Sequence, residues 1–177
     1  MPRLDIGDLT HALTLYRPWP WAFTLPENPK RVENRDWAPP HELLGQRFCL
    51  HAGAAWSSDA AEDIEFHLGV DLEARRPLMP PKVISHVARL VGYLVSYPSS
   101  PRNEGQVIAI SEALKAYVRA QAATLWYSGP YGWVVDQVVE LPRPISCPGQ
   151  VKLWQMPISI QHLVRSRLLE ETHAHTR

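Results

Sequence analysis

Two stretches near the amino terminus, RPWPW (residues 17–21) and KRVENR (residues 30–35), decide how this chain folds. The first sets two indoles beside two prolines, which is typical of a strand that ends in a turn or a short helix. The second holds a lysine, a glutamate and an arginine within six residues. As a strand it places Glu33 and Arg35 on one face and Lys30 on the other. A turn or bulge near Lys30 would instead bring all three charges together.

The residue types in these stretches suit a planar ligand. Aromatic rings beside a lysine, a glutamate and an arginine can bind a hydrogen-bonding or phosphate-bearing group such as a nucleotide base. The same residues are also typical of a turn in the core and of a solvated strand face. The spacing alone leaves both interpretations open.

Composition narrows the class of protein. The chain has 177 residues, enough for one domain with a real core. Its hydrophobic content of 45% and charged content of 20% are ordinary for a soluble globular protein. Lysine plus arginine equals aspartate plus glutamate, 18 of each, so a nucleic-acid site must be a local patch rather than a general positive field.

Cysteine spacing, apolar runs and short motifs in the sequence bear on cellular location, membrane insertion, cofactors and metals. Cys49 and Cys147 lie far apart, neither in a CxxC motif, and no signal peptide opens the sequence, so we expect a reduced cytoplasmic setting without a disulfide. No apolar run approaches the roughly 18 residues of a membrane span. The GxGxxG, P-loop, GxSxG and HExxH motifs are missing, and acids between residues 59 and 73 fit a solvated helix face, so we expect no cofactor and no metal. The oligomeric state is left open.

Residue periodicity predicts a mixed α+β domain built on a small, mostly antiparallel barrel or sheet. Strands are predicted over residues 12–16, 31–37, 46–51, 87–97, 134–141 and 151–154, with Trp37 and Trp154 in the core. Helices are predicted over residues 18–25, 59–68, 112–125 and 158–169; Ser57 or Ser58 caps the second and Ser111 the third. Connecting segments are predicted over residues 75–81, 98–105 and 142–149, the second being the most mobile.

Five blocks of sequence resemble the ASCH domain, a module of the PUA-like superfamily. ALTLYRPW (12–19) is similar to the opening I-x-Q-P-W strand and turn of that family, and PKRVENR (29–35) resembles its signature G-x-K-x-x-E-x-R. RFCLHAG (47–53), GWVVD (132–136) and PGQVKLW (148–154) are similar to later strands. The blocks follow the order of the family. Two departures are Arg17, where glutamine is usual, and Asn28-Pro29, which replaces a glycine turn.

The resemblance implies a PUA-like β-barrel with flanking helices and a cleft lined by Lys30, Glu33 and Arg35. It implies a flexible leader over residues 1–11, an ASCH domain over 12–157 with an elaborated segment at about 57–125, and a carboxy-terminal helix and tail over 158–177. The family is thought to bind RNA or other nucleic acid. Some members are amidohydrolases that act on acetylated cytidine, and others have been credited with ribonuclease activity. The amidohydrolases carry a threonine three residues after the lysine, where this chain has Glu33.

Three functions therefore remain open. The first is a binding module for RNA, another single-stranded nucleic acid or a nucleotide. The second is a hydrolase on the same cleft, with Lys30 and Glu33 as catalytic acid and base. The third is a protein-interaction module that uses the proline-rich loops and the carboxy-terminal helix. The candidate ligand-binding residues are Pro18, Trp19, Trp21, Lys30, Glu33, Arg35, His51 and Trp133.

Overall fold

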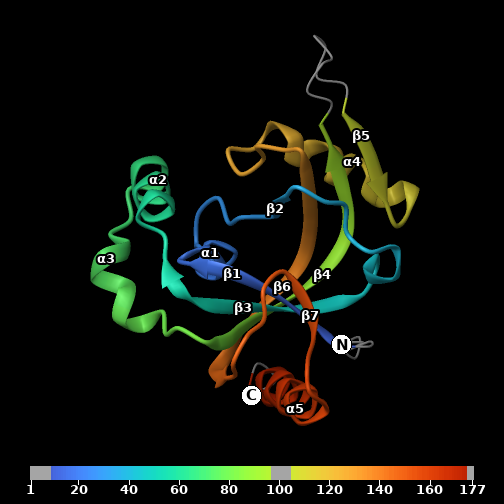
Figure 1. Ribbon diagram of the computed structural model, residues 1–177. Helices are drawn as coiled ribbons and strands as arrows, with labels where there is room; N and C mark the ends of the chain where they lie inside the picture. Colours follow the sequence, from blue (N-terminus) through green and yellow to red (C-terminus); the bar gives the residue numbers. More distant parts are fainter. Residues whose placement is uncertain (1–8, 97–104, 175–177) are drawn as a thin grey trace. The chain divides into compact units, whose positions relative to one another are not determined.

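The computed structural model describes residues 9–96 and 105–174, and its chain divides into two compact units (Figure 1). Unit 1 comprises Met1–Pro29, Phe48–Val87 and Val138–Arg177, and unit 2 comprises Lys30–Arg47 and Ala88–Gln137. Three of the passages between the units fall inside strands, namely β3 (Arg47–Trp56), β4 (Val83–Val95) and β6 (Tyr131–Ser146). The segment 57–125 is thus shared between the units rather than forming one separate insertion.

The described residues form a mixed α+β fold with seven strands and five α-helices. The strand order is β2-β6-β4-β3-β1-β7, and β5 pairs with β4. β2 (Val32–Arg35) pairs with β6, and β5 (Gln106–Ala109) with β4, both antiparallel. β1 (His11–Arg17) pairs antiparallel with β7 (Leu153–Gln155) but parallel with β3, an exception to the antiparallel pattern that we expected. Within the described residues this order has two ends and does not close.

The first strand and helix of unit 1 lie close to where the sequence predicts them. β1 continues to Arg17, and α1 (Trp19–Ala22) follows at once. Pro18 occupies the N-cap and Pro20 the first turn, where a missing N–H costs nothing. The helix ends three residues before the predicted boundary at Leu25, because Thr24 and Leu25 no longer have helical geometry.

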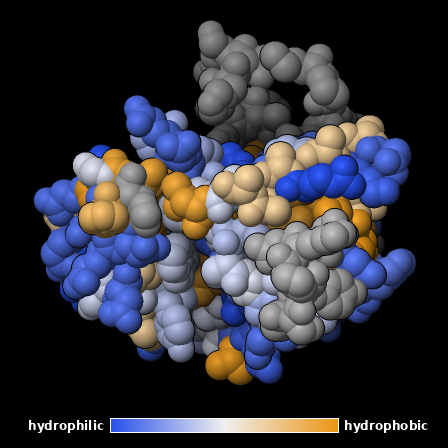
Figure 2. Space-filling model, turned by 90° about the horizontal axis from the view of Figure 1, so that it is seen from above, coloured by the Kyte–Doolittle hydropathy of each residue, from blue (hydrophilic) through white to orange (hydrophobic). Residues whose placement is uncertain are grey.

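The second helix of unit 1, α2 (Ser58–Leu68), confirms its predicted capping. The Ser57 hydroxyl accepts a hydrogen bond from the Ala60 N–H at 3.2 Å. Gly69 ends the helix with φ of 64°, a conformation that glycine adopts without strain. Hydrophilic residues predominate on the left of Figure 2, where α2 and α3 (Leu72–Arg75) lie. The acids of this region thus form a solvated face.

Three segments of unit 1 that were predicted to be connections or a tail are instead partly helical or extended as a strand. α3 and a 3₁₀ turn (Arg76–Leu78) occupy much of the expected linker 75–81. β6 runs on through the first half of the expected connector 142–149. The last helix, α5 (Ile158–Ala174), continues five residues beyond Leu169 into the expected tail. The expectations for residues 1–8 and 175–177 lie outside the described residues.

The core of unit 1 joins α5 to residues of five strands, β1, β3, β4, β6 and β7. Figure 1 shows α5 beside β7 and the end of β6. Val164 and Leu168 supply the buried side of the helix, while Leu163, also in the predicted helix 158–169, is 45% exposed. The buried members of this cluster are Leu9, Ala12, Cys49, Ile84, Val87, Leu141, Ile145, Cys147, Trp154, Met156, Val164 and Leu168. The expectation that Trp154 is a core residue is therefore confirmed, and both cysteines are free thiols.

Unit 2 departs further from the sequence-based prediction. The β5 strand was missed, because four residues are too few for a clear alternation. α4 (Glu112–Ala120) ends in a 3₁₀ turn (Gln121–Ala123), and its N-cap Ser111 makes no side-chain capping bond. Leu125, the last residue of the helix predicted over 112–125, lies beyond that turn and is 46% exposed. The predicted loop 98–105 lies almost wholly outside the described residues.

Trp37 lies outside the strand in which it was predicted. β2 ends at Arg35, so Trp37 lies in a bend after the strand and is partly exposed rather than being a core strand residue.

Across the ranges 9–96 and 105–174, no helix combines the length and the apolar character that crossing a bilayer requires.

Candidate functional site

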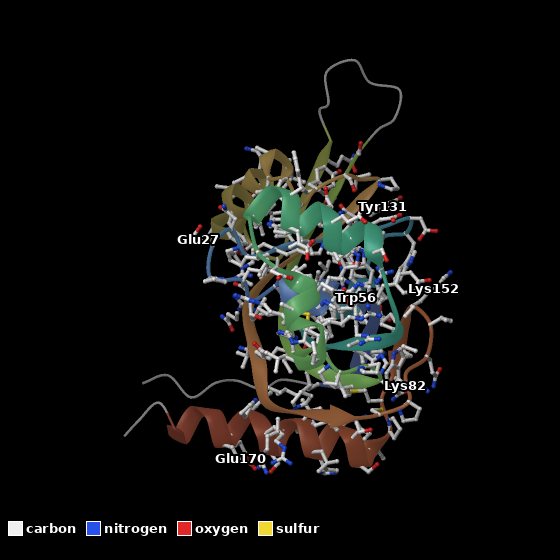
Figure 3. All side chains as sticks on the ribbon, turned by 90° about the vertical axis from the view of Figure 1, so that its left-hand side faces the viewer. Glu27, Trp56, Lys82, Tyr131, Lys152 and Glu170 are labelled. Atoms are coloured by element: carbon white, nitrogen blue, oxygen red, sulfur yellow. The ribbon has the colours of Figure 1, made fainter. Side chains whose placement is uncertain are left out.

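The register between β2 and β6 places the KRVENR charges beside aromatic residues in unit 2. Glu33 pairs with Trp133 and Arg35 with Tyr131, the residue labelled at the start of β6 in Figure 3. Directly opposed residues in neighbouring strands project from the same face. Glu33, Arg35, Trp133 and Tyr131 therefore share one face of this strand pair, and Asn34 lies on the other.

The carboxylate of Glu33 holds the other two charged groups of the motif. Its Oε2 lies 3.2 Å from Lys30 Nζ, and its Oε1 lies 3.3 Å from Arg35 Nη2. Lys30 precedes the strand, so the alternation of side chains does not apply to it, and its ammonium also donates to the Val32 carbonyl. The structure thus adopts the convergent arrangement, one of the two left open by the sequence.

Burial divides this charged cluster into an enclosed pair and an accessible cation. Lys30 is 3% exposed and Glu33 8%, whereas the Arg35 side chain is 19% exposed. Burial lowers the pKa of the Lys30 amine below its ordinary value; Glu33 acts against that shift, and Arg35 adds to it. The expectation that all three groups line one solvent-accessible cleft is therefore not met by Lys30 and Glu33, which are both buried. Arg35 is the member that a ligand can reach.

Trp133 packs inside unit 2 and exposes none of its ring. Its indole N–H donates to the Trp37 carbonyl at 3.1 Å, and the two rings meet edge to face with centroids 4.6 Å apart. Stacking of a base on Trp133, which the sequence suggested, would first require the core to rearrange. Partly exposed aromatic residues of this unit include Trp37, Tyr93 and Tyr131, and the ring centroids of Tyr93 and Tyr131 lie 6.5 Å apart. Sequence reasoning missed Tyr131, because its position opposite Arg35 depends on strand register.

Four further candidate residues lie in unit 1, namely Pro18, Trp19, Trp21 and His51. Pro18 is buried at the N-cap of α1, and Trp19 is partly exposed at the start of that helix. Trp21 is buried, and its ring meets the buried imidazole of His86 edge to face at 6.0 Å. Of the predicted aromatic stacking residues in this unit, only Trp19 has substantial accessible surface.

His51 is tied into the core of unit 1 through both ring nitrogens. Nδ1 lies 3.2 Å from the Thr14 hydroxyl, and Nε2 lies 3.0 Å from the Cys147 carbonyl. The Trp154 indole donates to the same hydroxyl at 3.0 Å. Burial lowers the pKa of His51, so the neutral ring is favoured. A ligand could use these nitrogens only by displacing bonds that hold β1, β3 and the segment before β7 together.

A second buried histidine in unit 1 lies in a polar cluster that sequence reasoning missed. His86 Nε2 is 3.0 Å from the Thr24 hydroxyl, and Nδ1 is 2.8 Å from the Ser85 hydroxyl. Glu140 is 3.3 Å from Thr24 and 3.9 Å from His86. A hydroxyl, an imidazole and a carboxylate can form a nucleophilic site. Burial lowers the pKa of His86 to about 3, which makes it a poor base at neutral pH.

The chemistry available in unit 2 is that of a guanidinium held in place by a carboxylate. Arg35 can donate to a phosphate or to a base edge, and its fixed fork favours bidentate contacts. Among the described residues, no group of three or more histidine, cysteine, aspartate or glutamate side chains is placed to hold a metal ion. A scan against protein-family models finds no match to this sequence, and a search of curated proteins finds no matching relative.

Proposed function

We propose that this chain is an ASCH-type domain of the PUA-like superfamily that binds RNA, another single-stranded nucleic acid or a nucleotide. The binding surface is the face of β2 and β6 that carries Arg35 and Tyr131. The proposal includes closure of the sheet into a small barrel and a cytoplasmic setting, with which two free thiols are compatible. The five blocks that resemble the family support it, because each falls on or beside a strand: β1, β2, β3, β6 and β7.

The observation that carries this proposal is the bridging position of Glu33. A carboxylate shared by Lys30 and Arg35 leaves the cluster with one net positive charge, which is located at its accessible end. Lys30 thus acts as a positioning residue: its buried charge compensates Glu33 and keeps that carboxylate in place. Arg35 contacts the phosphate or base edge, and Tyr131 offers a partly exposed ring for stacking.

The experiment is a titration of a short single-stranded RNA at fixed, low salt. Loss of one charge-assisted hydrogen bond of about 1.5–3 kcal/mol lowers affinity roughly ten- to hundredfold in Arg35→Ala. Arg35→Lys restores the charge without the fork and recovers part of the affinity. Arg75→Ala, which removes an exposed arginine from α3 in unit 1, is the control for net charge. Equal affinity of all four proteins would refute the site.

A hydrolase on the same residues is the second candidate, favoured by the enclosure of Lys30. A buried amine whose pKa is lowered can exchange protons closer to neutral pH than an ordinary lysine, and Glu33 lies within hydrogen-bond reach. Incubation with acetylated cytidine and with RNA, followed by chromatography of the products, tests this candidate. Turnover by the wild type and its loss in Lys30→Ala would establish it. Failure of both binding and turnover would leave the protein-interaction function.

A further inference from the structure

Unit 2 contains a pocket of about 770 Å³ that the proposed function does not use. We call it the α4 pocket; α4, the ends of β4 and β5, and residues 127–129 line it. Asn34 fixes part of its wall, since its amide donates to the Trp126 carbonyl at 2.8 Å and its oxygen accepts from the Ser128 N–H at 3.0 Å. Because Asn34 projects from the face of β2 opposite to Glu33 and Arg35, the α4 pocket is separate from the proposed binding surface.

Two cations of α4 line this pocket. Lys115 and Arg119 are four residues apart, so they lie on the same side of the helix. Lys115 makes an exposed ion pair with Glu112 at 3.3 Å, an interaction that contributes little in water. Within the part of the chain that the structure describes, the Arg119 guanidinium has no ion-pair partner, and none of the residues that line the pocket is acidic. The lining therefore carries two positive charges.

Hydroxyl groups and an apolar surface complete the lining. The Tyr127 ring lies against Gly132, where an added Cβ would stand 2.7 Å from the ring, so this position of the ring depends on glycine. The Tyr127 hydroxyl is hydrogen-bonded to Ser96, and the exposed Ser128 lies next to it along the chain. Leu94 and Val107 contribute apolar surface. A volume within about 300–1,000 Å³ and apolar surface combined with a few convergent polar groups are features of small-molecule sites.

We propose that the α4 pocket binds a small organic phosphate monoester. At neutral pH a phosphomonoester carries about −1.5 to −2 charges and three acceptor oxygens, so one phosphate can contact Arg119 and Lys115 together even though Lys115 also pairs with Glu112. Lys115 and Arg119 bind the phosphate oxygens, the hydroxyls of Ser96 and Ser128 provide further donors, and the organic body lies on the apolar surface. The same phosphate chemistry occurs in a free ester and in the terminal phosphate of an oligonucleotide, so the experiment must separate these sources.

The test measures binding to the full-length chain by isothermal titration calorimetry with four probes: phenyl phosphate, uridine 5′-monophosphate, uridine and inorganic phosphate. The two esters bind wild type at least tenfold more tightly than uridine or inorganic phosphate. Lys115→Gln and Arg119→Gln, which alter only the solvent-facing side of α4, each weaken the esters by tenfold or more. Arg75→Gln, the matched charge control, leaves their affinity within twofold.

Arg35→Gln separates this proposal from the proposed function. It weakens single-stranded RNA and leaves phenyl phosphate, which has no base, unaffected if the two sites are distinct, and the α4 variants show the reverse pattern. Equal ester affinity in wild type and both α4 variants would overturn the proposal, as would ester binding that Arg35→Gln alone abolishes. Binding of a 5′-phosphorylated oligonucleotide at the α4 residues, without binding of either free ester, would also overturn it.

Discussion

Gly149 lies against the imidazole of His51 so closely that a Cβ at position 149 would overlap three atoms of the ring. The ring cannot move aside, because both of its nitrogens are hydrogen-bonded. We expect Gly149→Ala to lower the free energy of unfolding by about 1–3 kcal/mol, the usual cost of overpacking a core. Urea denaturation measures this change. Gln150→Ala, next in the chain and exposed, is the control and should stay within about 0.5 kcal/mol of wild type. Similar effects of the two substitutions would contradict the prediction.

Removal of the Glu33 charge should destabilise unit 2. Glu33→Gln leaves the enclosed Lys30 without its carboxylate, and breaking a buried pair in this way costs about 3–5 kcal/mol. Burial already holds the pKa of Lys30 below its ordinary value of 10.5, and loss of Glu33 lowers it further. Above the folded-state pKa and below 10.5, the unfolded chain binds more protons than the folded chain, so stability rises with pH. The loss of stability relative to wild type should therefore shrink in urea titrations as the pH is raised toward 10.5.

The matched control for Glu33→Gln is Glu112→Gln. Glu112 and Lys115 form a pair of the same spacing and a similar distance, 3.3 Å, but the Glu112 side chain is fully in solvent contact on α4. Its loss should change stability by less than about 1 kcal/mol, because surface ion pairs contribute little. If both substitutions had equally small effects, the cluster around Glu33 would not be enclosed in solution.

Acid should weaken the fold through His86. Its pKa in the folded chain is about 3, below the ordinary 6.5, so under pH 6.5 the unfolded chain takes up a proton that the folded chain does not. Stability is therefore lost as the pH falls from about 7, by up to about 1.4 kcal/mol per pH unit from this residue. His86→Gln should flatten the dependence of the unfolding free energy on pH between 7 and 5. His41→Gln, a substitution at an exposed site, is the control, and its unfolding free energy should change with pH as that of wild type does. If His86→Gln also followed the wild-type dependence, a role for His86 would be excluded.

Truncation of Trp154 should strongly destabilise unit 1. Its ring is buried, and its indole N–H donates to Thr14, so Trp154→Ala should cost about 3–5 kcal/mol. Val151→Ala, three residues earlier and 83% exposed, should change stability by less than about 0.5 kcal/mol. Chemical denaturation of the two variants side by side checks the difference. A loss under about 1 kcal/mol for Trp154→Ala would contradict its core position.

The sequence predicted most elements, but it could not supply the information that comes from pairing. Ser57 and Gly69 mark the ends of α2 correctly, because capping and helix termination are local. The side-by-side position of Arg35 and Tyr131 depends on a register between residues almost a hundred positions apart, which periodicity cannot reveal. The same is true of the parallel pairing of β1 with β3.

The phase of a helix explains one local error, and the start of a strand decides one geometry that the sequence left open. Leu125 fits the apolar stripe only if α4 stays α-helical to its end, and the tighter 3₁₀ turn over Gln121–Ala123 breaks that phase. For the KRVENR motif, the sequence left two geometries open, because the choice depends on whether Lys30 belongs to the strand. The structure begins β2 at Val32, and this boundary brings the three charges together.

The chain passes between the two units within β3, β4 and β6, which limits how this protein can be dissected. Each unit is assembled from separate stretches of sequence, so no continuous fragment contains one whole unit without part of the other. Deletion mapping would therefore remove parts of both units with almost any internal cut, and a loss of binding in such a fragment would not locate the activity. Point substitutions, or complementation between fragments cut at loops, are the genetic tools that can assign an activity to one unit.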